Sequence, residues 1–424
     1  MCLKFKIFFP LLVWVFLAIF NLNAEENLGE ATTRLPINEI NNFTQVFEQI
    51  RTGYVKEITD TELLESAIEG MLSNLDPHSS YLNKKSYKSL KENATGAYGG
   101  LGVEVVGEKG AIRVIAPIDG GPASENDIRS GDLIVELDKS PVSKMNIQKA
   151  IDKLRGEKGT EIELTILRDG EDRTITKTLI RDTIQISSVR SKLLYENFGY
   201  IRIAQFQISS DKDFVDEYLK LEELNKKELD GLVLDLRNNP GGLVPPSISI
   251  ADMLLTSGKI VYTEGRLPNS NQEYYADPFD ISGGIPIIIL INGGSASASE
   301  IVAGALQDNR RAVVIGTQSF GKGSVQTVVP INENSAIKLT TAKYFTPNGR
   351  SIQALGISPD IVIERAEIKP FKTSNRAREK NLTGHLNTES KGEKTSSSQP
   401  PNIMADNQLY EALNILRGIK LLEK

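Results

Sequence analysis

The sequence is poor in two residue types on which much catalytic and metal chemistry depends, since it contains one cysteine and two histidines in 424 residues. A single cysteine excludes an internal disulfide and argues against Cys-based metal sites and a catalytic Cys–His pair. An excess of basic charge is also lacking, because the formal net charge is −6 and the two signs are interspersed. No basic surface is therefore predicted, and nucleic acid is not expected as a partner.

The N-terminus is typical of an export signal. Two lysines precede an apolar run over residues 7–20, and the small residue Ala24 follows shortly after it. The run is short for a membrane span, although residues 5–22 come near the lower limit. Two interpretations stay open: a cleaved signal peptide over residues 1–24, or an uncleaved anchor in the inner membrane. Both place the rest of the chain outside the cytoplasm, in the periplasm or cell envelope.

The chain is long enough for two or three domains, and its patterns predict a multidomain α/β protein. Stripes of apolar residues at helical spacing, short strands between glycine turns, and a polar stretch without periodicity mark its parts. The expected parts are a helical segment (37–96), a unit of short strands (97–182), a βα core (183–364), a disordered segment (365–402) and a C-terminal helix (403–424). The last helix has one apolar face, so it needs a partner surface in its own core or in a second subunit.

Residues 285–326 are the most informative stretch. The run 286–291 has no polar residue inside it and predicts a strand that is buried on both faces. A glycine-containing break and a helical pattern follow, which places Ser295, Ser297 and Ser299 at or beside a strand-to-helix turn. At such a turn, free backbone N–H groups and the helix dipole stabilise a developing oxyanion.

A serine hydroxyl in this position needs a base, which is usually histidine. His385 lies in the polar segment, and His78 lies far upstream in an Asp-Pro-His-Ser-Ser turn whose neighbours suggest no catalytic role. Lys322 is the better candidate, because flanking glycines, an aromatic residue and nearby apolar strands favour partial desolvation and a lowered pKa. If this segment is extended, Gln326 lies on the same side and can hold the amine.

Each motif alone has a plainer explanation. A Ser/Ala-rich helix start is common in ordinary capping and close packing. A Gly-Lys-Gly-Ser run is similar to a phosphate loop, but the full GxxxxGK[ST] spacing is absent. The two motifs together, in this order, are far more specific than either one.

The string GSASASEIVAGALQD followed by FGKGSVQ resembles the carboxyl-terminal processing proteases, also called tail-specific proteases. These are serine peptidases with a Ser-Lys dyad and a crotonase-like βα core. The resemblance implies that Ser297, the middle serine, is the nucleophile, that Lys322 is the general base, and that Gln326 orients the lysine. The residue pattern alone does not choose among the three serines.

A second glycine turn is expected beside the serine turn. Alternating strands and helices predict a βαβ arrangement, in which sites collect at the carboxyl ends of strands. The string DLRNNPGG also matches the family, and its glycines allow a substrate backbone to approach closely. Gly241 or Gly242, together with the N–H of Ala298, is assigned to the oxyanion hole, and the choice of glycine stays open. Asp235 and Arg237 are interpreted as an internal ion pair.

The strand-rich unit resembles a PDZ domain, through Tyr98-Gly-Gly-Leu-Gly-Val, a downstream Ser-Gly-Asp-Leu-Ile and one helix. Such a domain binds a peptide C-terminus by adding it as a strand to a sheet edge. The resemblance implies that backbone N–H groups of the glycine run point at the terminal carboxylate, while two apolar side chains line a pocket for the last residue. The expected peptide-binding residues are Gly99, Gly100, Leu101, Gly102 and Val103, with Leu101 and Val103 as the pocket.

Two further features match the family. Arg155 occupies the place of an arginine that links peptide binding to activation, and its alternative is a solvated cation at a helix end. The string LDPHSSYL, residues 75–82, belongs to a helical segment that often contributes to dimerisation, although a plain packing subdomain is equally open. The expected partners are protein substrates with exposed C-termini, a second copy of the chain, and an adaptor protein.

Three functions remain to be compared. The first is an exported serine endopeptidase that recognises protein C-termini and cleaves through an acyl-enzyme, without a metal ion or other cofactor. The second is a non-enzymatic envelope scaffold that binds peptides through the PDZ unit. The third, an acyl-CoA enzyme of crotonase type, explains neither the PDZ unit nor the export signal.

Overall fold

The computed structural model describes residues 36–118, 120–171, 173–194, 197–367, 383 and 406–422. The expected export signal, His385 and most of the polar segment lie outside these ranges. The chain divides into two units, one ending at Met71 and one starting at Leu72. Within the described ranges, no helix combines the length and the apolarity needed to cross a membrane.

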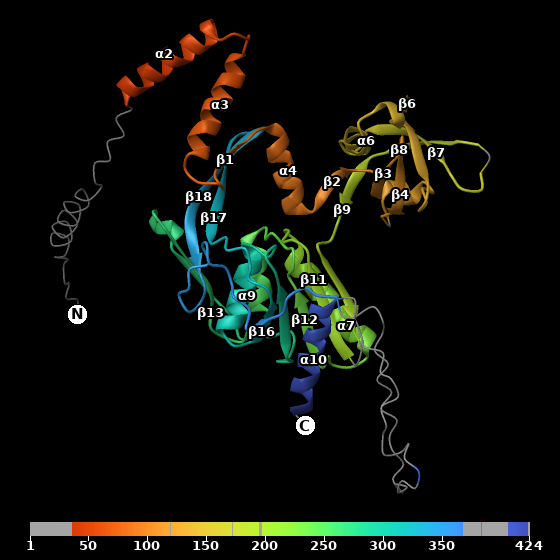
Figure 1. The fold of residues 1–424 in the computed structure, drawn as a ribbon, viewed down its shortest axis with the longest axis vertical. Helices are drawn as coiled ribbons and strands as arrows, with labels where there is room; N and C mark the ends of the chain where they lie inside the picture. The colour runs from red at the N-terminus through yellow and green to blue at the C-terminus, as the bar shows by residue number, and fades with distance from the viewer. Residues whose placement is uncertain are drawn as a thin grey trace, which may run out of the picture. The chain divides into compact units, whose positions relative to one another are not determined.

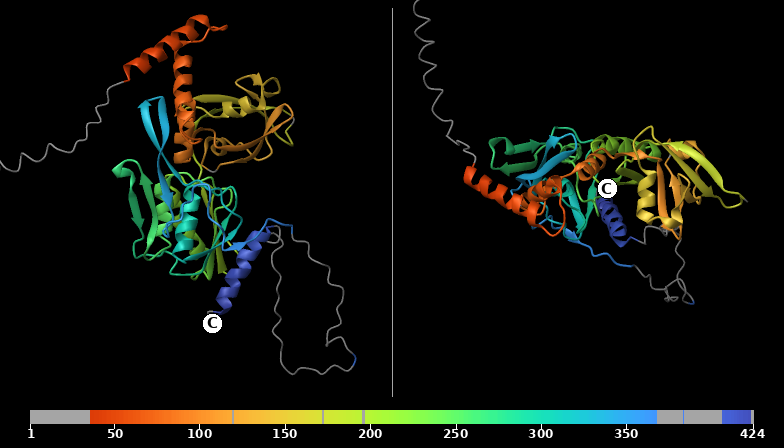
Figure 2. Two further views of the ribbon diagram at one scale, coloured as in Figure 1. Left: turned by 60° about the vertical axis from the view of Figure 1, so that its left-hand side comes forward. Right: turned by 90° about the horizontal axis from the view of Figure 1, so that it is seen from above.

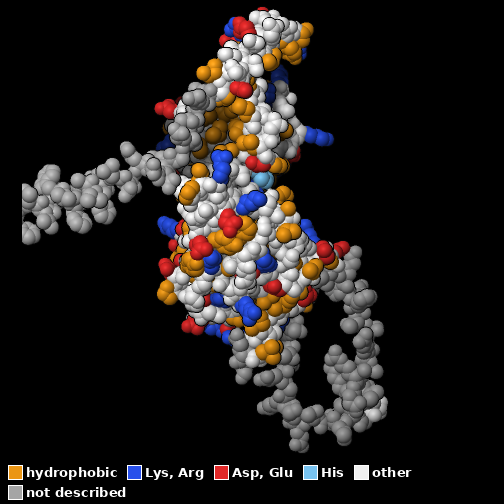
Figure 3. Space-filling model, turned by 90° about the vertical axis from the view of Figure 1, so that its left-hand side faces the viewer, with side chains coloured by type: hydrophobic (Ala, Val, Ile, Leu, Met, Phe, Trp, Pro, Cys, Tyr) orange, Lys and Arg blue, Asp and Glu red, His pale blue; other side chains and the backbone are white. Residues whose placement is uncertain are grey.

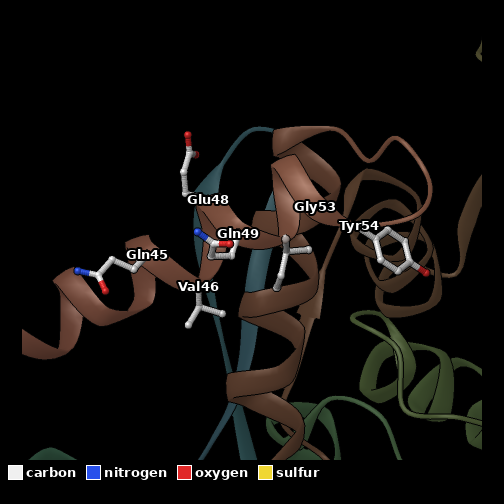
Figure 4. Close-up of a pocket in the computed structure, with 7 residues that line it drawn as sticks. Gln45, Val46, Glu48, Gln49, Gly53 and Tyr54 are labelled. Atoms are coloured by element: carbon white, nitrogen blue, oxygen red, sulfur yellow. The ribbon is translucent and has the colours of Figure 1, made fainter.

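The first unit contains α2 (Ile37–Gly53) and most of α3 (Asp60–Ser73). No residue of α2 is buried, and its apolar residues recur at three-to-four spacing while exposed to solvent. This apolar stripe consists of Ile37, Ile40, Phe43, Val46 and Ile50. A hollow of about 730 Å³ is lined only by the end of α2 and Tyr54 (Figure 4). Apolar residues in this pattern are typical of a helix face that packs against a partner.

The PDZ-like unit is built around one six-stranded antiparallel sheet with a buried helix face (Figure 1). Its elements are β3 (Val103–Glu108), β4 (Ala111–Pro117), α5 (Pro122–Glu125), β5 (Leu133–Leu137), β6 (Ser140–Pro141), η1 (Val142–Lys144), α6 (Ile147–Leu154), β7 (Glu161–Leu167) and β8 (Ile175–Ile180). Their order in the sheet is β3-β4-β5-β7-β8, with β6 beside β5. Two strands that lie outside this sheet, β2 (Ala97–Gly100) and β9 (Asp182–Gln185), pair with each other.

The second sheet system is the core of the βα domain. It contains β10 (Val189–Leu193), β11 (Phe198–Ile203), β12 (Gly231–Asp235), β15 (Ile287–Ile291), β16 (Ala312–Gly316) and β19 (Ile361–Val362), in that order. All neighbours are parallel except β10 and β11. All five residues of β15 are buried, as the aliphatic run predicts, because successive side chains point to opposite covered faces.

Helices cover both faces of this central sheet. On one face, α7 (Ser210–Asn225), α8 (Val244–Asp252) and α9 (Ala298–Asp308) pack against residues such as Ile287 and Ile289. On the other face, α10 (Asn407–Leu422) packs against Ile288 and Leu290 (Figures 1 and 2). The C-terminal helix therefore buries its apolar stripe on the core of its own chain.

The helix α10 is also held by charge. Arg237, just after β12, forms ion pairs of 2.7 Å with both Asp235 and Asp406, which precedes α10. The predicted pair of Asp235 and Arg237 is confirmed, and the structure adds the second carboxylate. The two carboxylates hold the pKa of Arg237 above its usual range despite burial of the guanidinium. The pair thus connects the end of β12 to the C-terminal helix.

An antiparallel five-stranded sheet lies beside the helices of the core. It contains β1 (Ser80–Leu82), β13 (Lys259–Gly265), β14 (Gln272–Tyr275), β17 (Ser324–Asn332) and β18 (Ser335–Phe345), with η3 (Pro268–Ser270) between β13 and β14. The strand β1, followed by α4 (Lys84–Thr95), pairs with β18. The residue pattern of the segment 75–82 predicts a turn, but the last three residues of this segment form β1. Sequence far upstream thus joins the hairpin of β17 and β18.

Candidate active site

Ser297 lies at the turn between β15 and α9, directly before the first helical residue. Its backbone φ of 58° and ψ of −116° lie outside the regions that non-glycine residues usually adopt. The residue is buried, with 8% exposure. A strained backbone costs free energy and persists only where the surrounding structure holds it in place. Such residues cluster at functional sites.

The three serines of the run have different partners. The Ser295 hydroxyl donates to the carbonyl of Leu236 at 2.8 Å, and the Ser299 hydroxyl donates to the carbonyl of Asn239 at 3.0 Å. Both bonds attach the serine turn to the NNPGG turn after β12. Among these three side chains, Ser297 is the one that is not committed to a backbone carbonyl. The structure thus separates the three serines where the residue pattern does not.

The glycine turn reaches the serine turn from the neighbouring strand. Gly241 has a φ of +99°, and a Cβ there would lie 2.7 Å from the Cβ of Ser297, so this approach requires glycine. The N–H of Gly241 donates to the side chain of Asn239 at 2.9 Å. Gly242 lies opposite Phe206 in a β-bridge. The bridge is made by the carbonyl of Gly241 and the N–H of Leu243, so the N–H of Gly242 itself points away from Phe206. The geometry therefore favours Gly242, with Ala298 at the helix start, as the pair of oxyanion donors.

Lys322 lies in the segment between β16 and β17 and is half-buried. Burial is the main cause that lowers the pKa of its amine below the ordinary value, and the charge of Lys338 lowers it further. Asp76 and Glu300 act in the opposite direction. A lowered pKa increases the fraction of neutral amine, the form that can accept a proton.

Tyr344 on β18 connects the two candidate catalytic residues. Its hydroxyl oxygen lies 2.9 Å from the Ser297 Oγ and 2.6 Å from the carbonyl oxygen of Lys322. Burial raises the pKa of Tyr344, so the hydroxyl stays protonated. It has one proton and the carbonyl can only accept, so Tyr344 donates to Lys322 and accepts from Ser297. In this arrangement the Ser297 proton points at Tyr344.

Glu300 on α9 is a buried carboxylate that joins the serine turn to the lysine segment. Its Oε2 accepts from the N–H of Ser297 at 2.7 Å and from the N–H of Lys322 at 2.9 Å. Its Oε1 accepts from the Ser319 hydroxyl at 2.5 Å and from the N–H of Gly321 at 2.7 Å. Sequence analysis missed both Glu300 and Tyr344. A glutamate three residues into a helix is a signal for a capping box, which accounts for only one of these four bonds.

Replacing Glu300 with glutamine is expected to lower kcat/KM for a protein substrate by about 10- to 100-fold. The amide NH₂ of glutamine is a donor, and it would face two donors whose hydrogen bonds the carboxylate now accepts. This mismatch should displace the serine turn or the lysine segment. Steady-state kinetics on the full chain measures the loss. Glu223→Gln, on an exposed position of α7, is the matched control. Wild-type kinetics in Glu300→Gln would contradict a role for these bonds in the site.

Gln326 lies near the start of β17, but its amide bonds to other groups than the lysine. Its Nε2 donates to the Ser324 hydroxyl at 2.9 Å and, more weakly, to the Thr340 hydroxyl at 3.4 Å. The expected alternation does not run through this segment, because β17 begins after Lys322 and its pairing with β18 shifts register between Val325 and Gln326.

The expected peptide-binding residues lie together at the start of the PDZ-like unit. Gly99 and Gly100 belong to β2 and pair with β9, so they are part of a ladder, and Leu101 and Gly102 form the loop before β3. Leu101 is buried in the core of the unit at 2% exposure, and Val103 packs against the same core. The expected row of four free N–H groups is thus interrupted, because β2 extends further than the glycine pattern indicates.

Arg155 ends α6, and its guanidinium lies 4.9 Å from the ring centroid of Tyr98 in β2. A cation over an aromatic ring at this distance is attracted by the ring's negative face. The arginine therefore connects the end of the PDZ helix to the strand that enters the unit. Arg155 is exposed, so a solvated cation at the helix end and a link to activation both stay open.

A cavity of about 790 Å³ adjoins the serine turn through Tyr344. Its walls come from α8, α9 and the antiparallel sheet, and they are mainly apolar or carry threonine. Residues on these walls include Val244, Ile248, Ile301, Val325, Leu339 and Ala342. A pocket of this size and composition suits an apolar side chain or a segment of extended peptide.

Two further features concern metal ligands and surface charge. Within the ranges given above, no three His, Cys, Asp or Glu residues are placed to hold a metal ion. On the face drawn in Figure 3, acidic and basic side chains are interspersed without a continuous basic patch.

Three family profiles match successive parts of the chain. Residues 19–86 match the N-terminal domain of the activating protease CtpB, and residues 99–179 match the PDZ domain. Residues 197–363 match peptidase family S41. The order of these matches is the order of the helical, PDZ-like and βα parts of the fold.

Whole-chain comparisons give similar proteins. The chain is 44% identical over 384 residues to a carboxy-terminal-processing protease of Bartonella bacilliformis, covering 89% of this chain and 88% of that protein. It is 32% identical over 366 residues to the carboxy-terminal processing protease CtpA of Bacillus subtilis, covering 85% of this chain and 78% of that protein. A candidate S41 protease from Bacteroides fragilis has a similar fold, with a TM-score of 0.50 at 15% identity. The match covers 88% of this chain and 97% of that protein.

Proposed function

Because this chain belongs to the carboxy-terminal processing proteases of peptidase family S41, we propose that it is an exported endopeptidase that cleaves captured protein chains with Ser297 and Lys322. The membership itself makes the chain a serine-type peptidase with a PDZ domain. The observation that carries the assignment of the nucleophile is the contrast among the three serines. Ser295 and Ser299 hold the neighbouring turn, whereas Ser297 is strained and faces the lysine segment through Tyr344.

The reaction begins with a proton transfer. The neutral amine of Lys322 takes the proton of Ser297 after the hydroxyl turns away from Tyr344, and the serine oxygen attacks the scissile carbonyl. The N–H groups of Gly242 and Ala298 stabilise the tetrahedral oxyanion, each contributing on the order of 3 kcal/mol. Lys322 then gives the proton to the leaving amine, and the same lysine activates the water that releases the acyl-enzyme. The NH₂ group of Gln326 donates to Ser324 and Thr340, so in this proposal its carbonyl oxygen is the group that orients the amine.

Substrate is held at two places in this proposal. The PDZ domain captures the exposed C-terminus of a protein by strand addition, with the loop at Leu101 and Gly102 facing the terminal carboxylate. The apolar cavity beside Tyr344 receives the side chains next to the scissile bond. Both places suit unfolded or exposed apolar segments, because a folded protein presents few of them.

Blocking the terminal carboxylate of a substrate should separate the protease from the scaffold alternative. A peptide with an apolar last residue is prepared with a free or an amidated C-terminus, and its cleavage is followed by mass spectrometry. Amidation is expected to lower kcat/KM by about tenfold, with most of the change in KM, because charge-assisted hydrogen bonds are lost. Equal values for the two peptides would remove the proposed recognition of the C-terminus, and binding without any cleavage would favour the scaffold.

The location and assembly of the chain are also part of the proposal. The lysine-flanked apolar run at the N-terminus supports export, and the mass of the exported chain distinguishes a cleaved signal from an inner-membrane anchor. The exposed apolar stripe of α2 supports a homodimer through this helix, which sedimentation of the full chain tests. The role of Arg155 as a link to activation, and an adaptor protein as a further partner, rest on the family resemblance.

A further inference from the structure

We propose that Asp76, in the turn before β1, is a positioning residue for Lys322, acting through Thr340 and Gln326. The inference rests on the proposed function of Ser297 and Lys322, and it adds a contribution from the opposite end of the sequence. The upstream turn suggested no catalytic role in the sequence. The structure places this turn against the hairpin that follows the lysine.

Asp76 first fixes its own turn. Its Oδ1 accepts from the N–H groups of His78 at 2.7 Å and Ser79 at 3.0 Å, and its Oδ2 accepts from the Ser79 hydroxyl at 2.7 Å. Although burial opposes it, these bonds and one from Thr340 hold the pKa of Asp76 below its usual range. The carboxylate is therefore ionised at neutral pH and can act only as an acceptor.

The turn then attaches to the middle of β18. The Thr340 hydroxyl donates to Asp76 Oδ1 at 3.1 Å, and the Thr340 N–H donates to the Ser79 hydroxyl at 3.1 Å. Directly after the turn, Ser80 pairs with Lys338 as the first residue of β1. The two hydrogen bonds and the strand pairing together fix the position of Thr340 relative to the turn.

From Thr340 the connection reaches Gln326, its partner across the hairpin. The single hydroxyl proton of Thr340 goes to Asp76, so the oxygen can only accept a bond from Gln326. Gln326 must therefore turn its NH₂ group toward the hydroxyls of Thr340 and Ser324. Its Nε2 lies 3.4 Å from the Thr340 hydroxyl oxygen and 2.9 Å from the Ser324 hydroxyl oxygen. Its carbonyl oxygen is left on the other side of the amide. In the proposal this carbonyl oxygen accepts a hydrogen bond from the amine of Lys322 and so orients it.

Three charged groups act on the pKa of Lys322 from the elements around it, and they are Asp76 in the turn, Lys338 on β18 and Glu300 on α9. His78, in the same turn as Asp76, feels the charge of Lys322 in return. Burial and the charge of Lys322 both lower the pKa of His78, so the imidazole stays neutral at neutral pH. Asp76 raises the pKa of Lys322 and Lys338 lowers it. The turn thus influences both the orientation and the protonation of the amine.

The test compares kcat/KM against pH for the full chain and four variants. Activity requires neutral Lys322, so it falls as pH drops through the pKa of this amine. Asp76→Asn should move this acid limb to lower pH and reduce the plateau by about tenfold, because the asparagine NH₂ can reverse the Thr340 bond. Lys338→Gln should move the limb to higher pH. Thr340→Val should lower the plateau without moving the limb, and Asp216→Asn, exposed on α7, should change neither.

A second measurement separates this inference from the proposed function. In a Ser297→Ala background, acetylation of Lys322 by acetic anhydride across pH, read by mass spectrometry, reports the amine's pKa without any activity. Opposite shifts in Asp76→Asn and Lys338→Gln support the inference. An unchanged Lys322 titration in both, with wild-type turnover in Thr340→Val, overturns it and leaves the function intact. If Asp76→Asn does not fold, Thr340→Val carries the test alone, because it breaks the same connection at its next residue. Persistent cleavage by Ser297→Ala instead overturns the function.

Discussion

Replacing Ser297 with alanine is expected to lower kcat for an unfolded protein substrate by about 10⁴-fold or more. The change removes the oxygen that forms the acyl-enzyme, while the oxyanion donors and the cavity stay in place. Stability should change little, because Tyr344 keeps its bond to the Lys322 carbonyl and the lost hydroxyl is not bound to a backbone carbonyl. The measurement is single-turnover cleavage, together with thermal unfolding of the same preparation.

The neighbouring serines provide controls of the same chemistry. Ser295→Ala and Ser299→Ala each remove a bond between the serine turn and the glycine turn, so each should cost about 1 kcal/mol of unfolding free energy. Both should keep a much larger part of the activity than Ser297→Ala. Full turnover in Ser297→Ala, or an equal loss in a folded Ser295→Ala, would assign the nucleophile elsewhere. All three variants replace the same side chain with alanine. A difference in their remaining activity therefore depends only on the position of the serine in the site.

The fold was predictable where burial follows from composition. The aliphatic run of β15 and the apolar stripe of α10 both indicate covered faces, and the structure places them on opposite sides of one interface. The mixed α/β class, with a PDZ domain and helices at both ends, is confirmed. The partner of α10 was left open, because an amphipathic pattern states that a face is covered without stating by what.

The candidate site was predictable only in part. Ser297 and Lys322 belong to motifs that a sequence displays, whereas the groups that position them are polar residues whose roles depend on distant segments. Glu300 resembles an ordinary capping residue, and Tyr344 lies in a strand with no local signal. Asp76 meets Thr340 only because β1 pairs with β18. Contacts across such distances in the chain leave no periodic trace in one sequence.

The site depends on three turns that are held rigidly relative to one another. The serine turn is attached to the glycine turn by two serine hydroxyls, and to the lysine segment by Glu300. Tyr344 adds a bond to the hydroxyl of Ser297 that must break before proton transfer. The rigid part of the site is therefore the backbone, and the part that moves in the reaction is the serine proton.

Replacing Lys322 with methionine is expected to lower kcat/KM by about 10³-fold or more, because the change removes the proposed general base. Lys322→Arg should be as inactive, since a guanidinium does not lose its proton in proteins. In the wild type, the acid limb of kcat/KM should lie below the range of an ordinary lysine, because burial lowers the pKa of Lys322. Kinetics between neutral and alkaline pH measures both effects.

A small amine offers a direct check on this role. In Lys322→Ala, added ethylamine should restore part of the activity, and the recovery should rise with the concentration of the neutral amine as pH increases. Lys343→Met, at an exposed position on β18, is the matched control and should retain wild-type kinetics without amine. A Lys322→Arg variant with most of its activity, or a rescue that follows the charged form of the amine, would exclude proton transfer to Lys322. Rescue by the neutral form alone would show that the lysine acts as a base, since a purely structural lysine would not be replaced in that way.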